Sequence, residues 1–240
     1  MNIVADTHVH TIMSGHAHST LLENFNVAKQ KEHKFLFVTD HSGEMSMCPD
    51  KLAYFLCLNS TLPDVFEGIQ IVKGCETSII NTNAEIDFPE KLAQKSQWVI
   101  ASLHDYLFSP VGYDETTNIW LKIAENPYID VIGHCGEKKW KFDFKRCVKK
   151  FKEYNKIVEF NAASISNGKI DIEDAIQLAK LCKKYEVSVV VSSDAHFAPC
   201  IGNVSESIEL LNSVSFPKEL VLNSDCDKLN EYLYNKVKLV

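Results

Sequence analysis

The alternation of short apolar segments with helical stretches is the feature of this sequence that most limits its fold. Seven runs rich in β-branched and aromatic residues have the length of strands, and stretches with apolar residues at helical spacing follow most of them. Such alternation favours a parallel sheet, and seven strands predict a closed α/β barrel. The expected strands are 3–7, 35–39, 69–74, 98–102, 131–133, 158–161 and 187–192, and the expected helices are 21–31, 51–59, 115–124, 144–154, 172–185 and 205–211.

Length and composition fit one domain that spans residues 1–240. Hydrophobic residues make up 45% of the chain and charged residues 24%, which is ordinary for a globular protein. There is no linker, low-complexity segment or duplicated sequence. Residues 81–83 predict a small hairpin turn inserted after the third strand, and Asp171 is expected to cap the helix 172–185.

The formal net charge of -7 argues against a broad nucleic-acid-binding face, which would need clustered lysine and arginine. The sequence has no apolar run long enough to span a bilayer and no signal-peptide pattern, so we expect a cytoplasmic protein that does not bind membranes. The eight cysteines include no C-x-x-C pair. We therefore expect most of them to be buried thiols rather than disulfides or zinc ligands.

The positions of the nine histidines carry the functional information. Seven of them, together with two carboxylates, lie at the ends of expected strands or in the loops just beyond. The carboxyl ends of parallel barrel strands converge on one face, where the active sites of such folds lie. Residues two apart on an extended segment also point to one side. The convergent residues are His8, His10, His16, His41, Glu76, His104, His134, Asp194 and His196.

A single histidine is more often exposed or hydrogen-bonded than bound to a metal, but seven in one pocket would repel one another without cations. His18 and His33 are left out of this group. Nine donors exceed the four that one zinc ion takes, and three ions that share a carboxylate fit the number better. Three dications with two carboxylates give a local charge of about +4, which suits an anionic ligand. Imidazole donors favour Zn, with Mn or Fe as alternatives.

The ordered set of motifs resembles the PHP (polymerase and histidinol phosphatase) superfamily, and within it the small stand-alone bacterial phosphatases of the YcdX type. The motifs are His8-Val9-His10-Thr11, Ser14-Gly15-His16-Ala17-His18, Thr39-Asp40-His41, Gly74-Cys75-Glu76, Leu103-His104, Gly133-His134 and Ser193-Asp194-Ala195-His196. The resemblance implies a distorted (β/α)7 barrel, TIM-like, with a trinuclear metal site.

The same resemblance implies how the donors divide. One ion would be held by His8, His10, Glu76 and Asp194, a second by Glu76, His104 and His134, and a third by His16, His41 and His196. The family pattern is altered beside two ligands, at Cys135 and at Asp105-Tyr106, which bears on substrate preference more than on metal binding. Cys75 and Cys135 adjoin ligands, and we expect them to pack rather than to ligate.

These residues predict a metal-dependent phosphatase that hydrolyses a small phosphorylated substrate with a metal-activated water. Asp40 and Asp194 are the candidates for orienting a ligand or accepting a proton. Lys139 is the candidate for phosphate binding, against the alternative that it is solvated surface charge. Other possibilities are a nuclease or phosphodiesterase, an amidohydrolase and a non-catalytic phospho-ligand sensor. The sequence indicates neither the substrate nor the oligomeric state.

Overall fold

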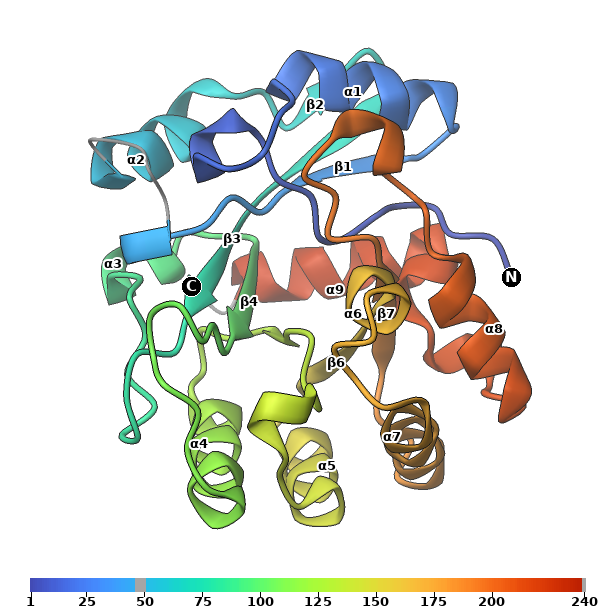
Figure 1. Cartoon of the computed structure of the whole chain (residues 1–240). Coiled ribbons are helices and arrows are strands. Elements are labelled where there is room, and N and C mark those ends of the chain that lie inside the picture. The colour runs from blue at the N-terminus through green and yellow to red at the C-terminus, as the bar shows by residue number, and fades with distance from the viewer. Residues whose placement is uncertain (46–50, 239–240) are drawn as a thin grey trace.

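A curled sheet of parallel strands with helices outside it organises the chain (Figure 1). The computed structural model describes residues 1–45 and 51–238. The strands follow the order β1-β3-β4-β5-β6-β7, all paired in parallel, and the short β2 pairs antiparallel with β3. Their bounds are β1 Phe35–Val38, β2 Val65–Phe66, β3 Ile69–Ser78, β4 Trp98–Ser102, β5 Val131–Ile132, β6 Ile157–Asn161 and β7 Val189–Ser192. This architecture confirms the predicted barrel-like α/β fold.

The helices surround the sheet, with α4, α5 and α7 side by side along its outer face (Figure 1). All six expected helices are present, whereas the short α3 and α6 and the long C-terminal α9 were not predicted. In the described residues the helices are α1 Leu21–Gln30, α2 Lys51–Thr61, α3 Glu90–Ala93, α4 Tyr113–Glu125, α5 Phe144–Glu153, α6 Ala162–Ser166, α7 Ile172–Lys184, α8 Ser205–Ser213 and α9 Cys226–Lys238.

The N-terminal segment lies between β1 and β7, but it is not the strand that was predicted for residues 3–7. On one side the amides of Lys34 and Thr39 donate to carbonyls of this segment, and on the other the His10 amide donates to the Ala195 carbonyl. The ladder is interrupted because the Val9 amide donates to the Thr39 hydroxyl instead of to a carbonyl. The segment is extended and carries the first two histidines to the carboxyl edge of the sheet.

Three further expectations have mixed outcomes. The turn at 81–83 is confirmed, since an antiparallel bridge pairs Ile79 with Ile86. Asp171 precedes α7 as expected, but its side chain makes no capping hydrogen bond, because Lys138 and Lys141 bind its carboxylate. Glu76 lies inside β3 rather than after it, since this strand continues to Ser78.

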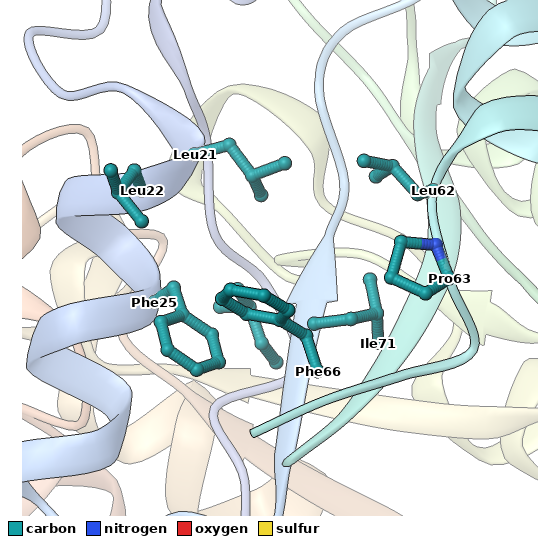
Figure 2. Close-up of a pocket in the computed structure, with 8 residues that line it drawn as sticks. Leu21, Leu22, Phe25, Leu62, Pro63, Phe66 and Ile71 are labelled. Carbon is teal, nitrogen blue, oxygen red and sulfur yellow. The ribbon is translucent and has the colours of Figure 1, made fainter. Parts of the chain in front are cut away.

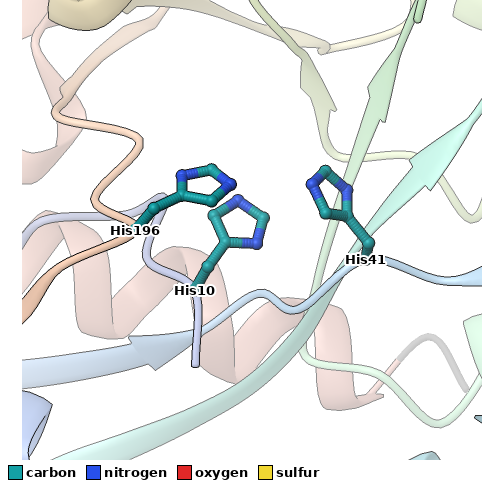
Figure 3. A group of neighbouring side chains, drawn as sticks. All are labelled: His10, His41 and His196. Carbon is teal, nitrogen blue, oxygen red and sulfur yellow. The ribbon is translucent and has the colours of Figure 1, made fainter. Parts of the chain in front are cut away.

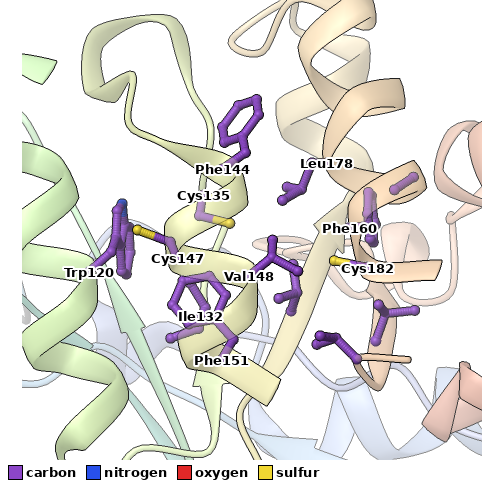
Figure 4. Packing of buried hydrophobic residues seen from close by; sticks show 14 of the residues in the cluster. Trp120, Ile132, Cys135, Phe144, Cys147, Val148, Phe151, Phe160, Leu178 and Cys182 are labelled. Atoms are coloured by element: carbon purple, nitrogen blue, oxygen red, sulfur yellow. The ribbon is translucent and has the colours of Figure 1, made fainter. Parts of the chain in front are cut away.

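Alternate strand residues face two different apolar cores. Inward-facing side chains such as Phe35, Phe37 and Ile100 pack inside the sheet with Leu229 and Leu233 of α9. The intervening residues pack against the outer helices, as Figure 4 shows for Ile132 and Phe160 with Trp120, Val148, Phe151 and Leu178. This alternation decides which polar residues near the strand ends can face the pocket.

Four cysteines pack in the apolar clusters between the sheet and the outer helices. Cys75, Cys135, Cys147 and Cys182 are buried free thiols, and the first two pack in apolar clusters as expected beside their ligand neighbours. Cys57 and Cys200 are exposed and Cys226 is half-buried, so the expectation that most cysteines are buried thiols is confirmed by four of the seven described ones. Cys48 lies outside the described residues. None of the described helices has the length and apolarity to cross a membrane.

Candidate metal centre

The nine predicted donors come together at the carboxyl edge of the sheet. A cavity of about 180 Å³ opens there, and seven of the nine line it. His8 and His10 are fully buried at its base. The seven that line the cavity are His16, His41, Glu76, His104, His134, Asp194 and His196. The convergence expected from the strand ends therefore occurs, although the donors come from segments as far apart as the N-terminus and the loop after β7.

Glu76 lies at the centre of this group. Its Oε2 is 2.9 Å from His41 Nδ1, 3.1 Å from His8 Nε2 and 3.4 Å from His10 Nε2. Its Oε1 is 3.1 Å from His134 Nε2 and 3.3 Å from His104 Nε2. Burial opposes ionisation of Glu76, but the imidazoles of His8, His41 and His104 outweigh it and hold the pKa of the carboxyl well below its usual range. The two oxygens thus address two separate sets of imidazoles.

Asp194 faces His8 and His10 from the opposite side. Its Oδ1 is 3.2 Å from His10 Nε2 and 3.6 Å from His8 Nε2. The backbone of Asp194 is left-handed, with φ 56°, a conformation that aspartate tolerates better than most residues. Burial alone would lower the pKa of His8, but the surrounding carboxylates of Glu159, Glu76 and Asp194 outweigh it and raise that pKa well above its usual range.

A third group faces the cavity mouth. Figure 3 shows the rings of His10, His41 and His196 converging, and one nitrogen of each lies within 4.8 Å of the others. His196 Nε2 is also 2.9 Å from Nε2 of the exposed His16. Burial, followed by the charge of His41, lowers the pKa of His10 well below its usual range. Neutral imidazoles with convergent lone pairs are the form that binds metal ions.

Several of these donor atoms are buried without a hydrogen-bond partner, which is costly for a polar atom in a closed protein interior. They are His8 Nε2, His10 Nε2, His41 Nδ1 and Asp194 Oδ1. All four belong to the convergent set, and two further triads of donor atoms lie within 4.8 Å of one another: His8, His10 and Glu76, and His41, Glu76 and His104. The donor set therefore fits divalent cations, which would satisfy the unpartnered atoms.

The imidazole of His10 is oriented by a relay that ends at Asp40. The Ser14 hydroxyl donates its only hydrogen to Asp40 Oδ1 at 2.6 Å, so it accepts from His10 Nδ1 at 2.9 Å. This arrangement leaves the lone pair of His10 on Nε2, which faces Glu76 and Asp194. The other partners of Asp40 are Thr11, through its amide and hydroxyl, and the Tyr54 hydroxyl.

Strand alternation explains why Asp40 does not face the cavity. Leu36 and Val38 of β1 point toward the outer helices, and Asp40 continues that side of the strand. His41 lies on the opposite parity and lines the cavity. The two residues of the Asp40-His41 pair therefore have different surroundings, although they are adjacent in sequence.

Two buried carboxylates at the site were missed by the sequence analysis. Glu159 in β6 accepts from His8 Nδ1 at 2.7 Å and from the His134 amide at 2.6 Å. Asp6 accepts from the Ser193 amide and hydroxyl and from the Gly202 amide. Glu159 could have been found from its position in the strand, since side chains alternate and the neighbouring Val158 and Phe160 face the outer core. A charged residue between them faces the barrel interior.

Charged side chains surround the cavity mouth. Lys139 binds Asp105, which lines the cavity beside His104, while Lys169 and Glu137 line it directly and were not predicted. Of the two histidines left out of the site, His18 is exposed and does not line this cavity. His33 is buried, and burial lowers its pKa against the opposing charge of Asp6.

A separate apolar cavity of about 280 Å³ lies between α1 and the β2 hairpin (Figure 2). Its labelled walls include Leu21, Phe25, Leu62, Phe66 and Ile71, all without charged groups. No acid, base or metal donor lines it, so the chemistry of the described residues concentrates at the histidine cluster.

Comparison with known proteins finds a family model and relatives in sequence that match this chain. A family model described as PHP domain matches residues 6–167. A protein named probable phosphatase from Clostridium novyi (strain NT) is 36% identical over 240 residues, which cover all of this chain and 98% of that relative.

Two solved structures share the fold at low sequence identity. Histidinol phosphate phosphatase from Lactococcus lactis, in complex with zinc, L-histidinol and phosphate, is 15% identical with a TM-score of 0.61, over 88% of this chain and 94% of that chain. A chain of archaeal ribonuclease P, solved with mature tRNA, is 16% identical with a TM-score of 0.59, over 97% of this chain and 90% of that chain. These two likenesses establish the architecture alone.

Proposed function

This chain belongs to the PHP domain family, and from that premise we propose that it is a metal-dependent phosphoesterase with a trinuclear site. The observation that carries the proposal is the set of nine convergent donors, four of whose buried atoms have no hydrogen-bond partner. The family model ends at residue 167, before Asp194 and His196, and the phosphatase relative spans the whole chain. We therefore propose residues 1–240 as one catalytic unit.

The proposed ligand sets follow the two oxygens of Glu76. His8 and His10 lie near Oε2, as does His41, and Asp194 approaches the same nitrogens of His8 and His10. His104 and His134 lie near Oε1, so Glu76 would bridge two ions. His16, His41 and His196 would hold the third ion near the mouth. The close approach of His10 to His41 and His196 supports placing this third ion beside the first. Zn suits the imidazole donors best, with Mn or Fe as alternatives.

When bound, the ions would supply Lewis-acid chemistry and lower the pKa of a nucleophilic water. The chain's own contribution is to place donors around a small cavity whose local charge would attract an anion. Asp194 is the proposed group for orienting a ligand or accepting a proton, because it lines the cavity beside the proposed ions. Asp40 is enclosed by donors, so we assign it the positioning of His10 through Ser14.

The proposed substrate is a small phosphorylated molecule. The cavity of about 180 Å³ suits a phosphoryl group with part of its leaving group, and phosphate is bound in the Lactococcus lactis structure. Lys139 is the proposed phosphate contact at the rim of the cavity, because it forms an ion pair with Asp105, which lines the cavity. The pair is solvent-exposed, so Lys139 can exchange Asp105 for a substrate anion at little cost.

The proposal is tested by comparing ester classes. A monoester dianion has three terminal oxygens for the ions, whereas a diester has one charge and two free oxygens. We expect the zinc- or manganese-loaded protein to hydrolyse p-nitrophenyl phosphate roughly a hundredfold faster than bis(p-nitrophenyl) phosphate, as judged by kcat/KM.

The matched control for this assay is Glu76→Gln, which should abolish most of the hydrolysis and so exclude a contaminating phosphatase. Equal rates on the two esters would contradict the monoester proposal. Shortening of single-stranded oligonucleotides with both esters left intact would point to a nuclease instead.

A further inference from the structure

The buried Glu159 connects two of the proposed metal ligands, and this connection defines a role for it. We propose that Glu159 is a positioning residue that holds the His8 ring and the His134 backbone in the geometry the metal centre needs. The inference rests on the proposed function, since it takes His8 and His134 as ligands. Glu159 itself does not line the cavity.

Glu159 determines the tautomer of His8. Glu159 Oε1 lies 2.7 Å from His8 Nδ1, and the carboxylate can only accept, so Nδ1 carries the hydrogen. Nε2 of His8 then faces Glu76 Oε2 at 3.1 Å and has no hydrogen-bond partner of its own. A carboxylate on the far nitrogen of a ligand imidazole also increases its basicity toward a metal. Glu159 thereby directs the correct nitrogen of His8 into the site.

Glu159 also binds the backbone at His134. The His134 amide donates to Glu159 Oε2 at 2.6 Å, and His134 has φ 24°, a value that a residue with a side chain rarely adopts. A short bond to a charged acceptor offsets part of the cost of that conformation. The same conformation places His134 Nε2 3.1 Å from Glu76 Oε1. Glu159 thus stabilises the turn that aims this ligand.

The contacts of Glu159 require a carboxylate at this position. Oε1 accepts from His8 Nδ1 and from the Ser192 hydroxyl, while Oε2 accepts from the His134 amide. Donors therefore face both oxygens, and an amide side chain can accept on only one of them. In Glu159→Gln the amino group must face either His134 or His8. Facing the His134 amide it makes a donor–donor clash, and facing His8 it favours the tautomer that carries its hydrogen on Nε2, the nitrogen needed for a metal.

The role of Glu159 involves both oxygens of Glu76, because the two histidines that Glu159 positions lie near different oxygens of that carboxylate. His8 is near Oε2 of Glu76 and His134 is near Oε1. Loss of Glu159 should therefore weaken binding at two of the three proposed ion positions and leave the His16, His41 and His196 position least affected. A carboxylate that merely filled space would not produce this division.

The test is metal affinity, measured by competition of the purified protein with a chromogenic chelator for Zn²⁺ and by the visible spectrum of bound Co²⁺. We expect Glu159→Gln to weaken two of the three binding steps roughly 10- to 100-fold and to change the Co²⁺ spectrum. The matched control is Asp130→Asn, which alters a buried carboxylate that binds the Val99 amide and Tyr232 away from the site. Asp130→Asn should lower the Tm of the metal-free protein and leave metal affinity within about threefold of wild type.

A second control lies beside Glu159 itself. Ser192→Ala removes one donor from Oε1 but keeps the contacts with His8 and His134, so its metal affinity should stay near wild type. The proposal is overturned if Glu159→Gln binds Zn²⁺ like wild type, or if Ser192→Ala or Asp130→Asn weakens binding equally. Should Glu159→Gln not fold, Glu159→Asp takes its place, because the shorter side chain cannot reach both His8 and His134. A wild-type protein that binds the ions but hydrolyses no phosphate ester would refute the proposed function while leaving this inference intact.

Discussion

Individual ligands at this site differ in how many partners depend on them. Glu76 lies within 3.4 Å of His8, His10, His41, His104 and His134, whereas the exposed ring of His16 contacts His41 and His196. We therefore expect Glu76→Gln to lower kcat at least roughly tenfold more than His16→Gln does, because it removes a charge shared by two ions.

That comparison must be made at matched metal content, determined by elemental analysis of each variant. His18→Ala is the control, since His18 is exposed and outside the cavity lining, and it should keep most of the activity. Equal residual rates for Glu76→Gln and His16→Gln would contradict the bridging assignment.

At the scale of elements, the N-terminal segment is held to the loop after β7 by Asp6. This carboxylate accepts from the Gly202 amide at 2.7 Å and from the amide and hydroxyl of Ser193, next to Asp194. In Asp6→Asn an amino group faces one of these donors, so we expect a loss of about 1–3 kcal/mol in the free energy of unfolding. Urea denaturation of the metal-free protein measures this loss.

A conservative change elsewhere separates this effect from general sensitivity. Glu85→Gln alters an exposed side chain whose partner is Asn81 in the hairpin turn, and it should change the unfolding free energy by less than about 0.5 kcal/mol. A stability of Asp6→Asn equal to wild type would show that the segment is held by its backbone hydrogen bonds alone.

At the scale of the whole molecule, the proposed ions would join segments that are distant along the chain. We expect about three transition-metal ions per chain after incubation with excess Zn²⁺ or Mn²⁺, measured by elemental analysis after desalting. Binding to the folded state alone also stabilises it, by about 2.7 kcal/mol at a free concentration 100 times the Kd. Removing the ions with a chelator should therefore lower the Tm, and adding Zn²⁺ back should restore it.

A single ion per chain at saturation would contradict the trinuclear proposal. Three ions with no change in Tm would show instead that they bind the unfolded chain equally well. The metal-free protein should still fold, because its inward and outward apolar cores do not involve the ligands.

Much of the fold and of the candidate site could be predicted from the sequence because both depend on local periodicity. Apolar runs of strand length identified β1 and β3 to β7, and the positions of His104, His134 and Asp194 after such runs placed them at one edge of a parallel sheet. Parallel strands bring their carboxyl ends together whatever the details of packing. The family resemblance drawn from the motifs is confirmed by the PHP domain match.

The tertiary structure alone decided how those ligands are oriented. Glu159 is 151 residues from His8, and Asp6 is 187 residues from Ser193, so no local pattern could pair them. Tertiary hydrogen bonding also decided that the N-terminal segment is no continuous strand, since Val9 forms only an isolated bridge with Ala195 and its amide donates to the Thr39 hydroxyl. Periodicity along a chain reports which face a side chain occupies, but the partner that fixes its hydrogen or its ring is chosen only when distant strands become neighbours.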